Sequence, residues 1–360
     1  MNNSDLIKSA LREINKYSSK EITIMEVCGT HTQAIAKFGI GSLLNDNIRL
    51  VSGPGCPLCV TDESYIDKAI LLLKSHDVIL VSFGDLMKVH GSKGNLLDEK
   101  AKGKNIRVVY SPMEALKLAQ KYPNKKIVFL GIGFETTAPL IGLTVKTAKK
   151  LNIHNLFFLT ALKTMDSILH LILKEENSYI DGIICPGHVA SIKGSQYFAF
   201  IYDEYGIPSL VCGFEELDII SGIYTIVQQC FGRVKKNFYN LYRRCVREGG
   251  NPIAKEILWE VFSTEAEIWR GIGLVPKSAL VLNKGYESFD AAKVFNLNME
   301  RNVSESRCHC KEILLGYKAP RECSFFGREC KPQSPIGPSM VSREGACSIQ
   351  YRYGSGGENE

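Results

Sequence analysis

The sequence Ser52-Gly53-Pro54-Gly55-Cys56-Pro57-Leu58-Cys59-Val60-Thr61 decides how the rest of the chain is built. Before it comes a short apolar run, residues 48–51, which predicts a buried strand. After it, residues 62–74 place apolar side chains at helical spacing. The two cysteines are therefore expected at a strand-to-helix turn. There, backbone N–H groups and the positive end of the helix dipole favour the thiolate form of the first cysteine.

Two thiols at this spacing can close a small disulfide, share a metal ion or exchange with another disulfide. The alternative is that Cys56 and Cys59 are small apolar side chains that pack in a core. Glycine and proline on both sides argue against this alternative, because they let the backbone approach its neighbours closely and fix its path.

The composition of the 360-residue chain is that of a soluble globular protein with room for two or three domains. Hydrophobic residues make up 45% and charged residues 23% of the sequence. The net charge of +6 is spread out without a dense basic run, so nucleic acid is not expected as a partner. No run reaches the ~18 apolar residues that a membrane span needs, so no membrane association is expected either.

Cysteine usage points to a reducing compartment. Residues 1–20 alternate apolar and charged side chains in helical fashion and lack the apolar core of a signal peptide. The chain carries twelve cysteines. In the cytosol, clustered cysteines bind metal or do redox chemistry more often than they form structural disulfides.

Strand patterns alternate with helix patterns over most of the chain, which implies α/β domains with parallel sheets covered on two faces. We predict an N-terminal helix in residues 1–20, which could pack on the C-terminal domain. A first α/β domain is expected in residues 21–122 and a second in residues 123–232, the two facing a cleft. Residues 233–360 are expected to form a helical, loop-rich and cysteine-rich domain.

Unusual residues follow the predicted strands at their carboxyl ends, the edge at which open α/β sheets bind ligands. In the first domain these are Cys28, His31, Cys56, Cys59 and Asp85, and in the second Glu135, Thr136, His188 and Glu215. Two such edges would place thiols on one wall of a cleft and hydrogen-bonding or charged groups on the other. Alternatively, the carboxylates and threonines cap the helices that follow them.

Cys28 and His31 lie three residues apart after the predicted strand of residues 22–27. A soft thiolate and an imidazole at this spacing are plausible ligands of one transition metal. The alternative is a buried cysteine beside a helix cap made by Thr30, His31 and Thr32.

The last segment, residues 275–360, has too few apolar side chains for an independent core and needs a metal centre or a docking surface to hold one shape. It carries Cys308 and four further cysteines that suit either an iron–sulfur cluster or structural zinc: Cys310, Cys323, Cys330 and Cys347. Their spacing does not choose between the two metals.

Taken in order, these motifs cover essentially the whole chain and resemble the HypD family of hydrogenase maturation proteins. The matching segments are residues 26–32 (Glu-Val-Cys-Gly-Thr-His-Thr), 53–61, 83–85, 131–137 (Gly-Ile-Gly-Phe-Glu-Thr-Thr), 185–189 (Cys-Pro-Gly-His-Val), 213–215, 323–330 and 340–347.

The resemblance implies a cytoplasmic scaffold with redox activity. Together with the small partner HypC, it would hold the iron on which the cyanide and carbon monoxide ligands of the nickel–iron hydrogenase centre are assembled, with cyanide delivered by HypE. It implies Cys28 as the iron-ligating thiolate with His31 close by. Cys56 and Cys59 would be a redox pair resembling that of ferredoxin-dependent thioredoxin reductases. The cysteines at 310, 323, 330 and 347 would hold a 4Fe-4S cluster, with Cys308 as a rival to Cys310.

Two other interpretations stay open from the residues themselves. A freestanding iron–sulfur thiol–disulfide oxidoreductase would use the same cluster and cysteine pair but would not need Cys28 or His31. A purely structural zinc protein would act as an interaction hub and contain zinc without iron or sulfide.

Overall fold

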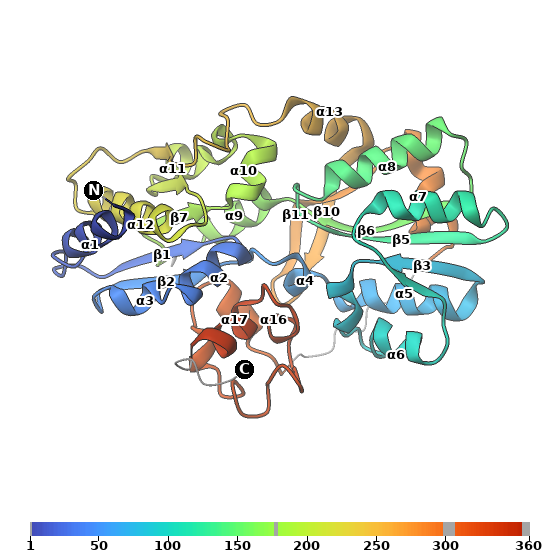
Figure 1. Ribbon diagram of the computed structural model, residues 1–360, viewed down its shortest axis with the longest axis horizontal. Coiled ribbons are helices and arrows are strands. Elements are labelled where there is room, and N and C mark those ends of the chain that lie inside the picture. The colour runs from blue at the N-terminus through green and yellow to red at the C-terminus, as the bar shows by residue number, and fades with distance from the viewer. Residues whose placement is uncertain (1, 176–178, 298–306, 355–360) are drawn as a thin grey trace. The chain divides into compact units, whose positions relative to one another are not determined.

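The computed structural model describes residues 2–175, 179–297 and 307–354 (Figure 1). The chain divides into two compact units, each built from segments that are distant in the sequence. Unit 1 comprises Met1–Cys56, Ile168–Asn251 and Cys308–Glu360, and unit 2 comprises Pro57–Ser167 and Pro252–Arg307. Each unit contains a largely or wholly parallel sheet, which confirms the predicted α/β class. Among the described residues, no helix is both long and apolar enough to cross a membrane.

Unit 1 is built on a fully parallel sheet. Its strands are, in spatial order, β2 (Ile48–Ser52), β1 (Ile22–Glu26), β7 (Gly182–Cys185), β8 (Ser209–Val211) and β9 (Phe238–Asn240). Because all the strands run in one direction, their carboxyl ends share one edge, and the loops after β1, β2, β7 and β8 meet there.

The helices of unit 1 precede the first strand, connect these parallel strands or belong to the C-terminal segment. They are α1 (Asn3–Ile14), α2 (Gly29–Lys37), α3 (Ile40–Leu43), α10 (Gly187–Lys193), η2 (Ser195–Phe198), α11 (Phe200–Tyr205), α12 (Glu216–Cys230), α15 (Cys310–Leu314), η4 (Pro320–Glu322), α16 (Pro338–Val341) and α17 (Ala346–Tyr353). Helix α17 packs on α2, so the C-terminal segment docks beside the first strand-to-helix turn (Figure 1).

The core of unit 1 explains where the N-terminal helix packs. Helix α1 lies against α12, and Ile14 joins Ile219, Ile220 and Ile223 in one buried cluster. The ring of Tyr17 completes this contact, and its hydroxyl accepts a hydrogen bond from Gln228 at 2.9 Å. The expected packing of residues 1–20 on the C-terminal domain is therefore replaced by packing on the helix that follows β8.

Unit 2 is built on a mixed sheet. Its strands are, in spatial order, β10 (Phe262–Trp269), β11 (Gly273–Leu282), β6 (Leu156–Lys163), β5 (Lys126–Gly133), β3 (Val78–Ser82) and β4 (Ile106–Val108). The pairs among β6, β5, β3 and β4 are parallel, whereas β11 pairs antiparallel with both β10 and β6. Strands β5 and β3 are buried almost throughout, as expected for parallel strands covered on two faces.

The helices of unit 2 are α4 (Pro57–Val60), α5 (Glu63–Ser75), η1 (Gly84–Lys88), α6 (Leu96–Ala101), α7 (Pro112–Lys121), α8 (Ala138–Lys150), α13 (Pro252–Val261), η3 (Lys284–Phe289) and α14 (Ala291–Val294). Helix α9 (Met165–Leu173) runs through the boundary between the units. Helix α7 begins with the capping box that its sequence predicts, Ser111 and Glu114 with Pro112 between them.

The domain boundaries expected at residues 122 and 232 do not coincide with the two units. Strands β1 and β2 of the predicted first domain pair with β7 and β8 of the predicted second domain, while β3 and β4 belong to the other sheet. Apolar periodicity identifies strands but does not say which strands pair, because parallel partners are brought together by long crossover connections.

The predicted C-terminal domain of residues 233–360 is also divided. Residues 252–307 belong to unit 2, where the hairpin of β10 and β11 extends the sheet, and the segment from Cys308 belongs to unit 1. At the start of this predicted helical and loop-rich domain lies β9, an edge strand of the unit 1 sheet. All three residues of β9 are partly buried, so its sequence lacks the alternation of apolar and polar residues that identifies a strand.

Candidate functional site

The turn between β1 and α2 places Cys28 at the N-cap of the helix. Its side chain is 7% exposed. Burial raises the pKa of the Cys28 thiol to about 12. The backbone N–H groups of His31 and Thr30, at the start of α2, lower this pKa but by less than burial raises it. A nearby cation reverses this preference, because a coordinated thiol is deprotonated. The turn therefore offers a protected sulfur that becomes a thiolate when a metal ion is present.

Glu26 holds the Cys28 turn in place through two hydrogen bonds. One carboxylate oxygen accepts a hydrogen bond from the Cys28 backbone N–H at 3.0 Å, and the other accepts one from the Thr32 hydroxyl at 2.5 Å. Burial raises the pKa of Glu26 to about 8. No role was predicted for this glutamate from the sequence, although its place two residues before the cysteine, in a largely apolar strand, is a usable signal.

His188 lies beside Cys28 and not on an opposing wall as expected. Its Nδ1 atom is 4.0 Å from the Cys28 sulfur, because β1 and β7 are neighbours in one sheet and their carboxyl-end turns meet. Partial burial lowers the pKa of His188. The imidazole is thus a neutral base next to the buried thiol.

His31 is fully buried on the same edge, with Nε2 3.0 Å from the Gly213 carbonyl oxygen and 3.7 Å from the Cys212 sulfur. Burial lowers the pKa of His31 to about 4, so the ring is neutral and Nε2–H donates to the carbonyl. Its Nδ1 atom has no hydrogen-bond partner among the described residues.

Phe214 separates the two imidazoles and was not singled out from the sequence. Its ring centroid is 4.3 Å from that of His188, stacked at 23°, and 4.6 Å from that of His31. Gly187 allows this arrangement, since a Cβ there would lie 3.0 Å from the Cys212 carbonyl oxygen and 3.2 Å from the Phe214 ring.

Cys56, in the turn that links β2 to α4, is disulfide-bonded to Cys59, which lies within α4. The expected close approach of the backbone is confirmed. A Cβ at Gly55 would lie 2.5 Å from both the Cys28 backbone nitrogen and the Val27 carbonyl carbon. The Cys-Gly-Thr-His turn and the chain entering the dithiol therefore pack backbone to backbone.

Replacement of Gly55 by alanine is expected to destabilise the protein by about 1–3 kcal/mol, because the added methyl group overlaps backbone atoms that cannot rotate away. The free energy of unfolding in urea measures this effect. Gly41→Ala is the matched control, since a Cβ there meets nothing within 4 Å. Equal stability of the two variants would contradict the packing described.

The C-terminal segment gathers the remaining predicted ligands. Cys330 and Cys347 belong to one buried cluster with Met340, against which Cys323 packs. The Cys308 and Cys310 sulfurs are 2.7 Å apart. Burial raises the pKa of the Cys347 thiol, and the thiols at 310, 330 and 323 raise it further. In the described part of the chain, however, no three Cys, His, Asp or Glu side chains are arranged to hold a metal ion.

This donor set fits a thiolate-bound iron–sulfur cluster by its chemistry. Cys323, Cys330 and Cys347 pack together, and Cys310 contributes to the raised pKa of the Cys347 thiol, so four possible thiolate donors share one segment. The sulfurs of Cys308 and Cys310 both lie next to Gly337, where an added Cβ would overlap them. Either cysteine can therefore be the first of the four cluster ligands.

Four other candidate residues lie elsewhere or act as caps. Glu215 is exposed at the N-cap of α12 in a capping box with Asp218, which agrees with the capping alternative. In unit 2, Asp85 and Thr136 are exposed. Glu135 is 1% exposed and accepts a hydrogen bond from the Met165 backbone N–H at 2.9 Å, at the start of α9.

Unit 2 also buries a lysine that no motif indicated. Lys163, at the end of β6, is 1% exposed, donates to the Ile268 carbonyl oxygen at 3.2 Å and lies over the Trp269 ring. Burial lowers its pKa from 10.5 to about 8. An ammonium group in this place is destabilising at neutral pH.

Replacement of Lys163 by methionine is expected to stabilise the protein by up to about 3 kcal/mol below pH 8. The folded-state pKa is below the unfolded one, so the unfolded chain binds the proton more tightly. The protonation of Lys163 therefore makes the parent protein less stable as the pH is lowered from 10.5 to 8, and this contribution is absent above pH 10.5. Urea unfolding between pH 7 and 10.5 should show this rise in the parent and not in the variant. An identical slope in both would refute the role of Lys163.

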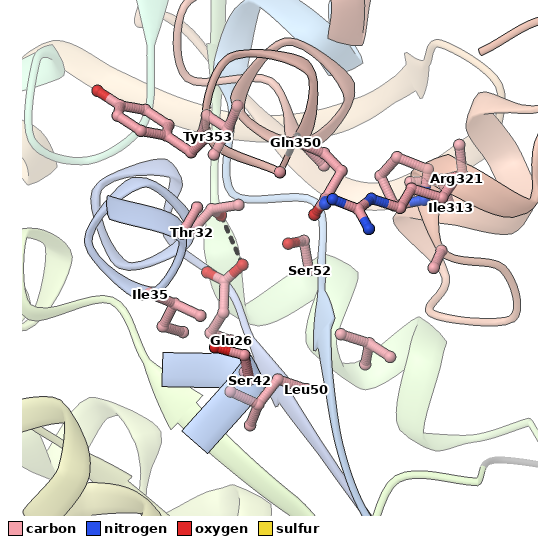
Figure 2. A pocket seen from close by; sticks show the side chains of 18 of the residues that line it. Glu26, Thr32, Ile35, Ser42, Leu50, Ser52, Ile313, Arg321, Gln350 and Tyr353 are labelled. Atoms are coloured by element: carbon pink, nitrogen blue, oxygen red, sulfur yellow. Dashed lines mark hydrogen bonds between the residues drawn. The ribbon is translucent and has the colours of Figure 1, made fainter. Parts of the chain in front are cut away.

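A cavity of about 510 Å³ lies behind the Cys28 turn, between the sheet of unit 1 and the C-terminal segment. Figure 2 shows Glu26 and Ser52, at the ends of β1 and β2, and Thr32 of α2, with Arg321, Gln350 and Tyr353 contributed by the C-terminal segment. Cys28 and Cys56 are not among its lining residues. Glu26 and Thr32, which are hydrogen-bonded to each other beside the Cys28 turn, are among its lining residues.

Comparisons with known proteins agree with these motifs. Residues 5–354 match the HypD family model, described as the hydrogenase formation hypA family. The chain is 40% identical over 337 residues to the hydrogenase maturation factor HypD of Escherichia coli K12, covering 93% of this chain and 90% of the relative. It is 39% identical over 342 residues to HypD of Azotobacter vinelandii and 40% identical over 339 residues to HypD of Cupriavidus necator. These alignments cover 93% and 92% of this chain, and 90% and 89% of the relatives.

Proposed function

Because the chain belongs to the HypD family of hydrogenase maturation factors, we propose that it is the scaffold on which iron receives cyanide and carbon monoxide for the nickel–iron hydrogenase centre. It would act in complex with HypC and accept cyanide from HypE. The observation that carries this proposal is the single sheet edge of unit 1, where Cys28 lies beside His188 and the dithiol turn packs on its backbone.

Cys28 is the residue that binds the iron substrate. Low-spin ferrous iron with cyanide and carbonyl ligands needs soft donors, and a thiolate is the softest donor in this turn. Binding requires the thiol proton to leave. Nδ1 of His188, 4.0 Å from the sulfur and on a neutral ring, is placed to accept that proton.

His31 and Phe214 position these groups. The Nε2–H bond to the Gly213 carbonyl fixes the tautomer of His31, and the Phe214 ring holds His188 in a stack. We assign Glu135 and Thr136 of unit 2 to positioning cyanide or the partner, and their replacement should impair maturation without loss of cluster iron.

The dithiol supplies redox chemistry. Reduction of the Cys56–Cys59 disulfide takes up two electrons and two protons and yields two thiols. Cys310, Cys323, Cys330 and Cys347 would hold a 4Fe-4S cluster, which supplies low-potential electrons when bound.

A second candidate function is a freestanding thiol–disulfide oxidoreductase, and the disulfide at Cys56 and Cys59 is the observation that favours it. This function leaves Cys28 and His188 without a task, although they are brought together at the same edge as the dithiol. For that reason the assembly of iron ligands is the preferred function.

The experiment that tests the proposal is infrared spectroscopy of the protein purified anaerobically together with HypC. Bands of iron-bound cyanide and carbon monoxide are expected in the complex. Metal analysis of the same sample should find iron and sulfide. A complex that contains iron and sulfide but lacks both kinds of band would favour the oxidoreductase, and zinc without iron would contradict both functions.

A further inference from the structure

The redox sulfur Cys56 is in contact with one side chain of the C-terminal segment that no motif or role above explains. The distance between its Sγ atom and the Ser342 hydroxyl oxygen is 3.3 Å, and both side chains are buried. Because Cys56 is disulfide-bonded, it has no S–H proton. The Ser342 O–H is therefore the donor and the sulfur the acceptor.

The hydroxyl is held in place by its own loop. The Ser342 backbone N–H donates to the Pro338 carbonyl at 3.0 Å, and its own carbonyl accepts from the Gly345 N–H at 3.1 Å. The hydroxyl oxygen also accepts a hydrogen bond from the Glu344 N–H at 3.2 Å, which leaves its proton to point at the sulfur. Ser342 is 2% exposed, so water does not compete for that proton.

The same loop is docked against the Cys28 turn. A Cβ at Gly29 would lie 2.8 Å from Cβ of Glu344 and 2.9 Å from its carbonyl oxygen, so only glycine permits this approach without displacement. The C-terminal segment, which carries the predicted cluster ligands, thus contacts Cys56 through the Ser342 hydroxyl. Hydrogen bonds within the loop and its packing against Gly29 hold this hydroxyl in place.

A hydrogen bond of this kind acts unequally on the two redox states. A disulfide sulfur carries little charge and accepts weakly, whereas a thiolate is a charged acceptor, and hydrogen bonds to charged groups are roughly twice as strong as neutral ones. A donor fixed at Cys56 therefore stabilises the reduced dithiol more than the disulfide.

We propose that Ser342 is a positioning residue that raises the reduction potential of the Cys56–Cys59 pair by donating its hydroxyl proton to Cys56. The inference rests on the proposed redox function of the pair and names the group that tunes it. In the half-reaction the S–S bond breaks and two electrons and one proton are taken up. Cys59 forms as the thiol and Cys56 as the thiolate that the hydroxyl stabilises, with one proton fewer than in the formation of two thiols.

The test is a redox titration of the full-length holoprotein in dithiothreitol buffers at about pH 9, above the usual cysteine pKa of about 8.5. Free Cys56 and Cys59 thiols are trapped by alkylation and counted by mass spectrometry. In Ser342→Ala the equilibrium constant for reduction should fall about tenfold, a shift of about 30 mV to more negative potential. Ser342→Thr, which keeps a hydroxyl, should stay near the parent, while Ser342→Val, which has the same shape without it, should shift like alanine.

Ser348→Ala is the matched control, because Ser348 is a buried serine of the same segment whose hydroxyl bonds neither sulfur in the described structure. It should keep the parent potential. If the alanine variant does not fold, the comparison of threonine with valine decides. Equal potentials in the parent, Thr and Val proteins would overturn the role of Ser342 alone. A parent disulfide that shows no reversible two-electron couple would overturn the redox function itself.

Discussion

Replacement of Cys28 by alanine is expected to abolish the infrared bands of iron-bound cyanide and carbon monoxide in the complex with HypC, while the visible absorption of the cluster remains. The expectation follows from the position of the thiol at the N-cap of α2, with its sulfur 4.0 Å from Nδ1 of His188. Alanine fills the turn without strain but supplies no ligand, so iron cannot be held there.

The control for this variant is Cys230→Ala. Cys230 is another thiol of unit 1, partly buried on α12, whose S–H donates to the Asp181 carbonyl oxygen at 3.5 Å. Cys230 is the last residue of α12, at the opposite end of that helix from the turn at Gly213 and Phe214. Its replacement should leave the infrared bands at the intensity of the parent protein. Bands that persist in Cys28→Ala, or that vanish equally in both variants, would refute the assignment.

Replacement of Cys347 by alanine is expected to remove the cluster. The parent should contain about four iron and four sulfide per chain in addition to substrate iron, and the variant should lose them together with the visible absorption. Cys347 packs in one buried cluster with Cys330 and Cys323, and all three of the other proposed ligands raise the pKa of its thiol, so it lies near each of them.

Cys245→Ala provides the comparison, because Cys245 is exposed and far in sequence from the C-terminal segment. Its iron and sulfide contents should equal those of the parent. Full iron and sulfide in Cys347→Ala would show that this cysteine is not a ligand. Replacing Cys308 and Cys310 one at a time then identifies the first ligand, since only the true ligand should behave like Cys347.

Local features of the fold follow directly from the sequence. The strand at residues 48–51, the helix at 62–74 and the capping box at Ser111 all form where the residues predict them, because each depends on periodicity or on contacts within one turn. Gly55 likewise lies where a backbone contact requires glycine.

Features that depend on pairing could not be predicted in the same way. His188 was expected opposite Cys28 because it follows a strand that was assigned to the second α/β domain, and only the pairing of β1 with β7 brings the two together. The strand β10 carries Glu265 and Glu267 within an exposed stretch, so its pattern does not resemble a buried strand. Ser342 contacts Cys56 from a loop without periodicity, and no local signal announces that contact.

The central claim, that Cys28 supplies a thiolate to substrate iron, is tested most directly by iron K-edge X-ray absorption on the Cys347→Ala protein in complex with HypC. Without the cluster, the remaining iron is substrate iron. The account predicts a sulfur contribution to its scattering, and predicts that adding Cys28→Ala removes that contribution together with the iron. Iron that stays bound with an unchanged number of sulfur neighbours in the double variant would contradict the claim.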